Sequence, residues 1–236
     1  MSGRWLDDGV TYSPEERAGV PWAMQLVVHV EKDPASEHLA VLRSTASAVA
    51  LALAAFTGPE AEEEVRARTE RWRSGPIRKV VRRARGAGWT RQLAVPGVFV
   101  HPGEVEVAAH VPGPVDQVHP EVARLQVGGL VLEGETGDPV APVRILLNPH
   151  VEMTTGKAAA QVGHAAQLAL ESLEPDRAAA WVADGAPVSV GTAAEGEWET
   201  LLREAPVVVA DGGFTEVPPG TVTVVAMPEW GGGRVS

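Results

Sequence analysis

The feature of this sequence that most constrains its fold is a set of landmarks that recur in the same order in the two halves. Trp72 and Trp89 return at one fixed interval as Trp181 and Trp198. Two further stretches recur at a slightly longer interval: Ser47–Leu53 matches His164–Leu170, and His101–Val107 matches Pro218–Val224. Self-similarity at a long interval is typical of a repeated structural unit. A chance likeness between two unrelated αβ domains is the alternative.

Each half reads as a strand, an alanine-rich helix, a second helix and further short strands. This order predicts the α/β class, with two repeated αβα-sandwich units, each a small mixed four-stranded sheet flanked by helices. We expect the two units to pack as an intramolecular pseudo-dimer. The predicted segments are an N-terminal leader 1–22, a first unit 23–112, a Pro- and Gly-rich connection 113–142, a second unit 143–230 and a tail 231–236.

A stripe of polar side chains marks the helix predicted for the second unit. Either Thr154 or Thr155 can cap the start of this helix, which ends near Leu173. Lys157, Gln161 and His164 are spaced i, i+4 and i+7, so they share one helix face. Burying polar groups without partners is costly, so the stripe is either a solvated edge or the wall of a site. The backbone N–H groups at the start of such a helix also suit an anion.

A second motif lies near the C-terminus, where Asp211–Thr221 precedes the apolar strand Val222–Pro228. Together with Gly156–Ala165 it resembles the second class of peptidyl-tRNA hydrolases. That family carries a helix of the form Gly-Lys-x-Ala-Ala-Gln-x-x-His-Ala, then an Asp-x-Gly-x-Thr segment, Pro-Gly-Thr and a final strand. The resemblance covers about residues 143–228, and it rests on both motifs together.

The resemblance implies an esterase that cleaves the bond between a peptidyl or N-blocked aminoacyl group and the 3′ adenosine of tRNA. It implies no metal and no other cofactor. Such a reaction needs a placed water, a base and oxyanion donors. The expected catalytic residues are Lys157, Gln161, His164 and Asp211, with His164 able to act as general base, Asp211 to orient the base or the water, and Lys157 to neutralise the oxyanion. The expected substrate-binding residues are Gly156, Thr215, Gly220 and Thr221.

The first unit lacks these functional side chains and is read as a degenerate copy. Ala40, Ser44 and Ser47 stand where the second unit has Lys157, Gln161 and His164, and Glu104 stands in place of Thr221. The second unit also departs from the family pattern, with Glu216 where the family usually has Gln, and with no basic residues on the strand Val188–Val190.

The charge distribution is in tension with a tRNA substrate. The formal net charge is −11, and phosphate affinity comes from Lys and Arg. Half of the 20 Lys and Arg residues nevertheless lie between Arg66 and Arg91, interleaved with two tryptophans. This basic window predicts an RNA-binding surface, and a solvated helix face is the alternative. The residues expected to contact RNA are Arg78, Lys79, Arg82 and Arg83.

Composition narrows the remaining possibilities. The sequence has no Cys, no signal-peptide pattern and no apolar run of membrane-spanning length, so we expect a cytoplasmic protein that does not interact with membranes. Two alternatives to the esterase stay open. One is a non-catalytic module on the same fold that binds RNA, a nucleotide or a protein, and the other is a hydrolase of another acyl ester.

Overall fold

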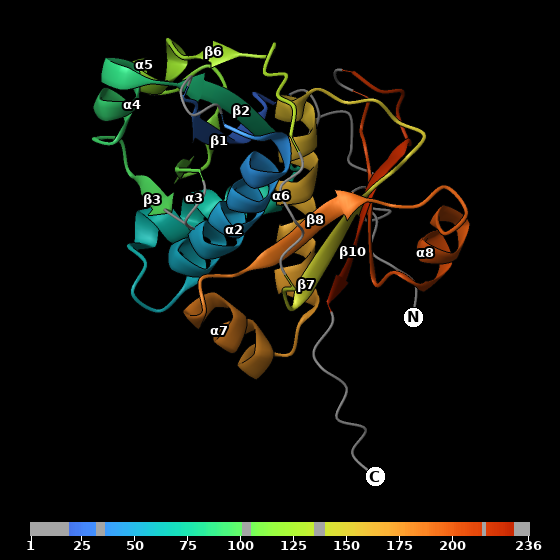
Figure 1. The fold of residues 1–236 in the computed structure, drawn as a ribbon. Helices are drawn as coiled ribbons and strands as arrows, with labels where there is room; N and C mark the ends of the chain where they lie inside the picture. The colour runs from blue at the N-terminus through green and yellow to red at the C-terminus, as the bar shows by residue number, and fades with distance from the viewer. Residues whose placement is uncertain (1–18, 32–35, 101–104, 135–139, 214–215, 229–236) are drawn as a thin grey trace.

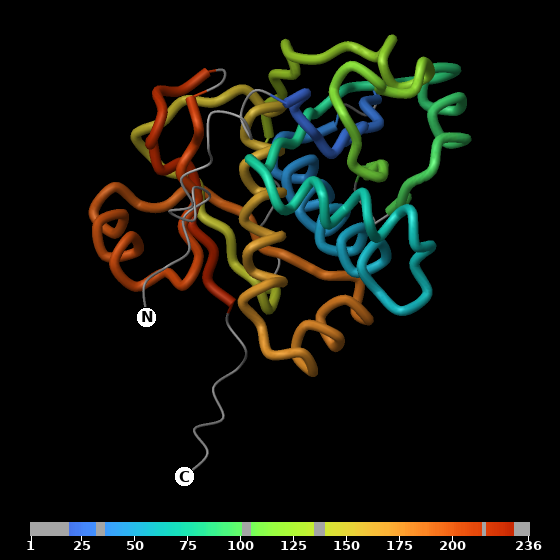
Figure 2. The backbone as a smooth tube through the Cα atoms, turned by 180° about the vertical axis from the view of Figure 1, so that it is seen from behind, coloured from blue at the N-terminus to red at the C-terminus, as the bar shows by residue number. Residues whose placement is uncertain are grey.

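The computed structural model describes residues 19–31, 36–100, 105–134, 140–213 and 216–228. Two αβ units lie side by side, with their long helices next to each other at the centre (Figure 1). The view from behind shows the same two units on either side of this helix pair (Figure 2). The α/β class with two mixed sheets flanked by helices is confirmed.

The N-terminal unit follows the predicted order of elements. Strand β1 leads through helix α2 to helix α3, strand β2, helix α4 and the hairpin of β3 and β4. Glu63 and Glu64 open α3 and Arg71 and Arg73 close it, which complements the helix dipole. The bounds are β1 Trp22–His29, α2 His38–Thr57, α3 Glu63–Arg73, β2 Lys79–Ala84, α4 Gly86–Gln92, β3 Gly97–Val100 and β4 Val107–His110.

The C-terminal unit repeats that order. Thr154 caps α6, because its hydroxyl accepts a hydrogen bond from the backbone N–H of Lys157 at 3.2 Å. Pro175 opens α7, where its fixed φ and missing N–H suit the first turn. The bounds are β7 Val143–Leu147, α6 Thr155–Ser172, α7 Pro175–Ala183, β8 Val188–Thr192, α8 Trp198–Glu204, β9 Val207–Ala210 and β10 Val222–Pro228.

Both sheets share one strand topology. The C-terminal sheet has the order β8-β7-β10-β9, and β2, β1, β4 and β3 are arranged in the same way in the N-terminal sheet. In each unit the first two strands are parallel and the other pairings are antiparallel. The register of the parallel strands also agrees. Met24 pairs with Lys79 in the N-terminal sheet, and the equivalent residues Val143 and Val188 pair in the C-terminal sheet.

The N-terminal sheet is larger than predicted. It has six strands rather than four, because the stretch expected to be a connection contributes β5, Gly113–Pro114, and β6, Gln126–Val127. These strands pair with β1 and β2, and the short helix α5, Pro120–Ala123, lies between them. An open sheet edge exposes unpaired backbone groups, and β6 pairs with the edge that β2 would otherwise leave open.

A single core cluster runs through both units. It contains the apolar residues of α2 and α6 and the inward-facing residues of the two sheets. On the outer faces, Trp89 of α4 and Trp198 of α8 each centre a smaller cluster. Trp89 and Trp198 therefore cover equivalent faces of the two sheets, whereas Trp72 and Trp181 belong to the shared core.

Helix α2 has the length and apolar character of a membrane span, so the expectation that no apolar run reaches that length is wrong. Within the fold, 83% of its most apolar stretch is buried. The core helix of a water-soluble fold passes the same test of length and composition, so this feature alone is weak evidence for a membrane span.

Candidate active site

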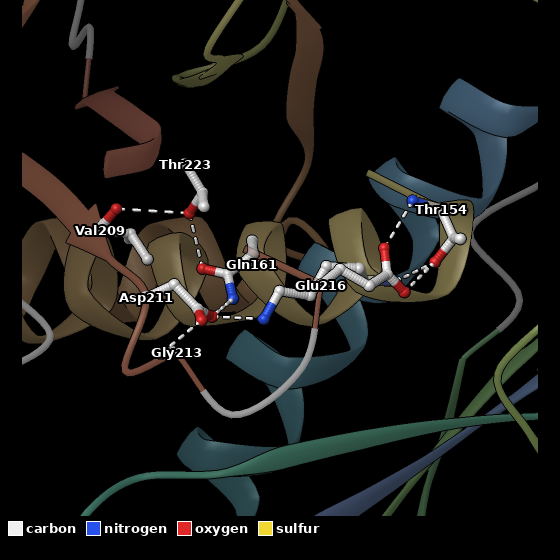
Figure 3. A network of polar contacts seen from close by, with 8 residues as sticks. Thr154, Gln161, Val209, Asp211, Gly213, Glu216 and Thr223 are labelled. Atoms are coloured by element: carbon white, nitrogen blue, oxygen red, sulfur yellow. Dashed lines mark hydrogen bonds and ion pairs between the residues drawn. The ribbon is translucent and has the colours of Figure 1, made fainter. Parts of the chain in front are cut away.

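Three of the expected catalytic side chains meet in one network of polar contacts (Figure 3). The Lys157 ammonium forms an ion pair with Oδ2 of Asp211. The Gln161 amide donates to the same oxygen at 2.7 Å. Lys157 and Gln161 come from the first two turns of α6, and Asp211 follows β9 directly. The network therefore joins the helix to the end of the sheet.

The loop after β9 holds the Asp211 carboxylate in place. Its Oδ1 accepts from the backbone N–H of Gly213 at 2.8 Å, and its backbone bonds to Gly220 and Thr221 at 2.7 and 2.8 Å. Gly213 has φ +74°, and a Cβ there would lie 2.6 Å from Pro219. The Asp-x-Gly and Pro-Gly-Thr pieces of the motif thus close one loop around the carboxylate.

Thr223 completes the network and was missed by the sequence reasoning. It is fully buried, and its hydroxyl donates to Oε1 of Gln161 at 2.7 Å. The register of β10 against β9 shifts between Val222 and Val224, and this irregularity lies at Thr223. Bulges re-aim side chains next to functional sites. A Thr in a strand of valines was the available signal, but simple alternation cannot reveal a bulge.

The start of α6 does not offer the anion site expected from its sequence. The N–H of Gly156 donates to the carbonyl of Leu130 at 3.2 Å, and that of Lys157 donates to Thr154. The Glu216 carboxylate accepts from the backbone N–H and the hydroxyl of Thr154 at 2.9 and 2.7 Å. The protein supplies its own partners at this helix end, so the prediction of free N–H groups on Gly156 and Lys157 is wrong.

His164 does not reach Asp211. It is buried, and its Nδ1 lies 3.0 Å from Nζ of Lys79, a residue of the N-terminal unit. Burial lowers the pKa of His164 well below its usual value, and the positive charges of Lys79 and Lys157 act in the same direction. A general base must gain a proton, which this environment opposes. No hydrogen bond joins His164 to Asp211, so the expectation that Asp211 could orient His164 as a general base is not met.

Two of the expected substrate-binding residues, Gly220 and Thr221, lie on the Asp211 loop. Gly220 is exposed with φ +80°, a conformation that favours glycine. Thr221 is half-buried, and its carbonyl accepts from the N–H of Asp211. Gly156 is half-buried in the first turn of α6. Thr215 lies outside the described residues.

The predicted RNA-contacting residues have largely structural partners. Lys79 is only 8% exposed, so it cannot bind RNA at the surface and that part of the prediction is wrong. Arg82 donates to Gln25 and to the carbonyls of Ala123 and Leu125 at 2.8, 3.2 and 2.9 Å. The remaining two, Arg83 and Arg78, are half-buried and donate to the carbonyls of Gly129 and Pro76, respectively. These side chains satisfy carbonyl groups of the N-terminal unit.

The family comparison agrees with the location of this network. A family model described as peptidyl-tRNA hydrolase PTH2 matches residues 143–229, which span β7 to β10 and contain all four network residues. The match supports a peptidyl-tRNA hydrolase-like function in general, with tRNA as the substrate. No curated protein matches the chain. Within the described part of the chain, no group of three or more His, Asp or Glu residues could hold a metal ion.

Proposed function

We propose that the C-terminal unit is an esterase that releases tRNA from peptidyl-tRNA or N-blocked aminoacyl-tRNA. The observation that carries the proposal is the pairing of Lys157 with Asp211, held by Gln161 inside the stretch that matches the family model. An ammonium beside an oriented carboxylate offers both kinds of group that ester hydrolysis needs.

In the proposed reaction Asp211 orients a water molecule and accepts its proton as the water oxygen attacks the ester carbonyl carbon. The positive charge of Lys157 stabilises the negative charge that develops on the carbonyl oxygen. The bond to the ribose oxygen then breaks, the ribose oxygen takes the proton from Asp211 and becomes a hydroxyl, and the acyl group leaves as a carboxylic acid that loses its remaining proton to solvent. Asp211 takes the base role here because His164 is buried beside Lys79.

The contact with the tRNA body is assigned to the N-terminal unit. Arg71 and Arg85 of the basic window are exposed, and their guanidinium groups have no partner among the described residues. They replace the four residues expected from the sequence, whose side chains are engaged within the unit. Exposed cations attract the phosphate backbone without reading sequence, which suits an enzyme that acts on many tRNAs.

We further propose that the two units arose by duplication and that the first has lost the catalytic side chains. The shared strand order and register support this origin. Equivalent backbone hydrogen bonds also support it. The N–H of His29 donates to the carbonyl of Glu106 in the first unit, and the N–H of Asn148 donates to the carbonyl of Thr223 in the second, both at 2.9 Å. The units would then form an intramolecular pseudo-dimer, and we place the protein in the cytoplasm, where its substrate occurs.

The proposed activity is tested by measuring the release of tRNA from N-acetyl-aminoacyl-tRNA by the purified chain. The parent should release tRNA, and Lys157→Met should release it at least about a hundredfold more slowly, because the oxyanion loses its charged donor. Arg203→Met removes a cation from the exposed helix α8 and serves as the matched control, with parent-like release expected. A parent protein that releases no tRNA would exclude the proposed function.

A further inference from the structure

The polar stripe on α6 continues past the candidate site into the contact between the two units. His164, Gln167 and Glu171 follow at spacings of three and four residues, so they stay on one helix face. The Lys79 ammonium donates to Oε1 of Gln167 at 2.6 Å, and Glu171 pairs with Arg73 at 2.8 Å. The second half of the stripe is therefore held by side chains from the N-terminal unit.

Lys79 links three side chains across this contact. Its Nζ donates to Gln167, lies 3.0 Å from Nδ1 of His164 and lies 4.9 Å from the centre of the Trp72 ring. Burial lowers the pKa of Lys79 well below its usual value, and the negative charge of Glu171 acts in the opposite direction. The amine can form a hydrogen bond with the His164 ring in either protonation state, so the contact fixes the position of the imidazole.

Gly163 gives Lys79 the space that this contact requires. Glycine is unfavourable inside a helix, and Gly163 does not have the positive φ that would call for it. A Cβ at this position would lie 3.1 Å from Val49 and 3.3 Å from Cδ of Lys79. The missing side chain allows both α2 and the stem of Lys79 to approach α6 closely.

We propose that Lys79 is a positioning residue for the candidate site of the opposite unit, acting through His164 on the part of α6 that carries Gln161. The inference rests on the proposed esterase function. Gln161 lies one helical turn before His164 and donates to Asp211 at 2.7 Å. A small rotation or shift of α6 would move that amide away from the carboxylate, and catalysis depends steeply on such placement.

Lys79→Met tests the proposal, because it keeps an unbranched stem and removes every donor. For N-acetyl-aminoacyl-tRNA, kcat should fall on the order of tenfold while KM stays at the parent value. The ¹⁵N chemical shift of His164 Nδ1 should move as its hydrogen bond is lost. Arg73→Met, which also breaks a contact between the units, is the matched control and should retain the parent kcat and His164 shift.

A double-mutant cycle separates positioning from general loosening of the contact. If Lys79 acts through His164, the variant with both Lys79→Met and His164→Asn should be no slower than the slower single variant. Additive losses of kcat in the double variant, or a parent-like kcat in Lys79→Met, would overturn the inference. The proposed esterase function would still stand in either case, provided that the parent protein releases tRNA. Should Lys79→Met fail to fold, Gly163→Ala replaces it, and this variant should also lower kcat because it displaces Lys79.

Discussion

The side-chain amide of Gln161 is shared between two strand ends: it donates to Asp211 at 2.7 Å, and its oxygen accepts from Thr223 at 2.7 Å. This arrangement fixes which end of the amide faces the carboxylate. If the amide were rotated by 180°, its oxygen would face the carboxylate of Asp211, where two acceptors would meet. Its N–H groups would then face the Thr223 hydroxyl, which also lies 3.3 Å from the Val209 carbonyl. Thr223 therefore sets the orientation of Gln161.

Thr223→Val should weaken both stability and activity. It keeps the shape of the side chain but leaves the buried Oε1 of Gln161 without its donor, which costs about 1–3 kcal/mol. Urea unfolding should show this loss, and kcat for tRNA release should fall. Thr223→Ser retains the hydroxyl and should recover most of the kcat. Equal activity in the Val and Ser variants would show that the hydroxyl does not orient Gln161.

Stability should decline on the acid side because of His164. Its pKa in the folded protein lies well below 6.5, so the imidazole stays neutral there and takes up a proton only when the chain unfolds. Below pH 6.5 the unfolded state therefore binds more protons than the folded state. The free energy of unfolding then decreases by about 1.4 kcal/mol for each unit by which the pH is lowered, for one such group.

The His164→Asn variant isolates this contribution. The difference between the parent and variant unfolding free energies should shrink from pH 7.5 to 5.5. His110, whose pKa is also lowered by burial, is unchanged in both proteins and cancels in the comparison. A difference that stays constant over this range would mean that His164 has the same pKa in the folded and the unfolded protein.

Glu216→Gln should improve tRNA binding. The carboxylate at the start of α6 repels the phosphates of an approaching substrate, and the amide retains an acceptor for Thr154. The KM for N-acetyl-aminoacyl-tRNA should fall a few-fold at low salt, with a smaller effect at high salt because of screening. An unchanged KM at low salt would show that RNA does not pass this helix end.

Replacing Arg71 and Arg85 together with Gln should weaken tRNA binding and reduce its salt dependence. Each lost phosphate contact should flatten the slope of log affinity against log salt by about 0.7 to 0.9. Cleavage of a minimal N-acetyl-aminoacyl-adenosine ester should stay at the parent rate, since that substrate lacks the tRNA body. Unchanged affinity and slope would show that Arg71 and Arg85 do not contact tRNA.

The α/β class and the order of elements were predictable because they depend on local periodicity. The recurrent tryptophans marked equivalent positions, since Trp72 and Trp181 lie in the shared core and Trp89 and Trp198 cover the outer faces of the sheets. Helix spacing placed Lys157 and Gln161 together and the resemblance supplied Asp211 as a third site residue, but the ion pair of Lys157 with Asp211 was not predicted.

Long-range packing decided what the sequence alone could not show. Lys79 looked like part of an exposed basic run, but it opens β2 at the contact between the units and its stem lies against Gly163. His164 shares its helix face with Gln161, yet the neighbouring unit covers it. The pairing of β5 and β6 with the first sheet likewise depends on contacts across the chain rather than on local pattern.

The most direct test of the account is the single-turnover release of tRNA from N-acetyl-aminoacyl-tRNA by the parent and by Asp211→Asn. The variant keeps the size of the side chain and removes the charge that orients water and pairs with Lys157. The proposed mechanism requires release by the parent and a rate at least about a hundredfold lower in the variant, with substrate binding preserved. Equal rates in the two proteins would contradict it.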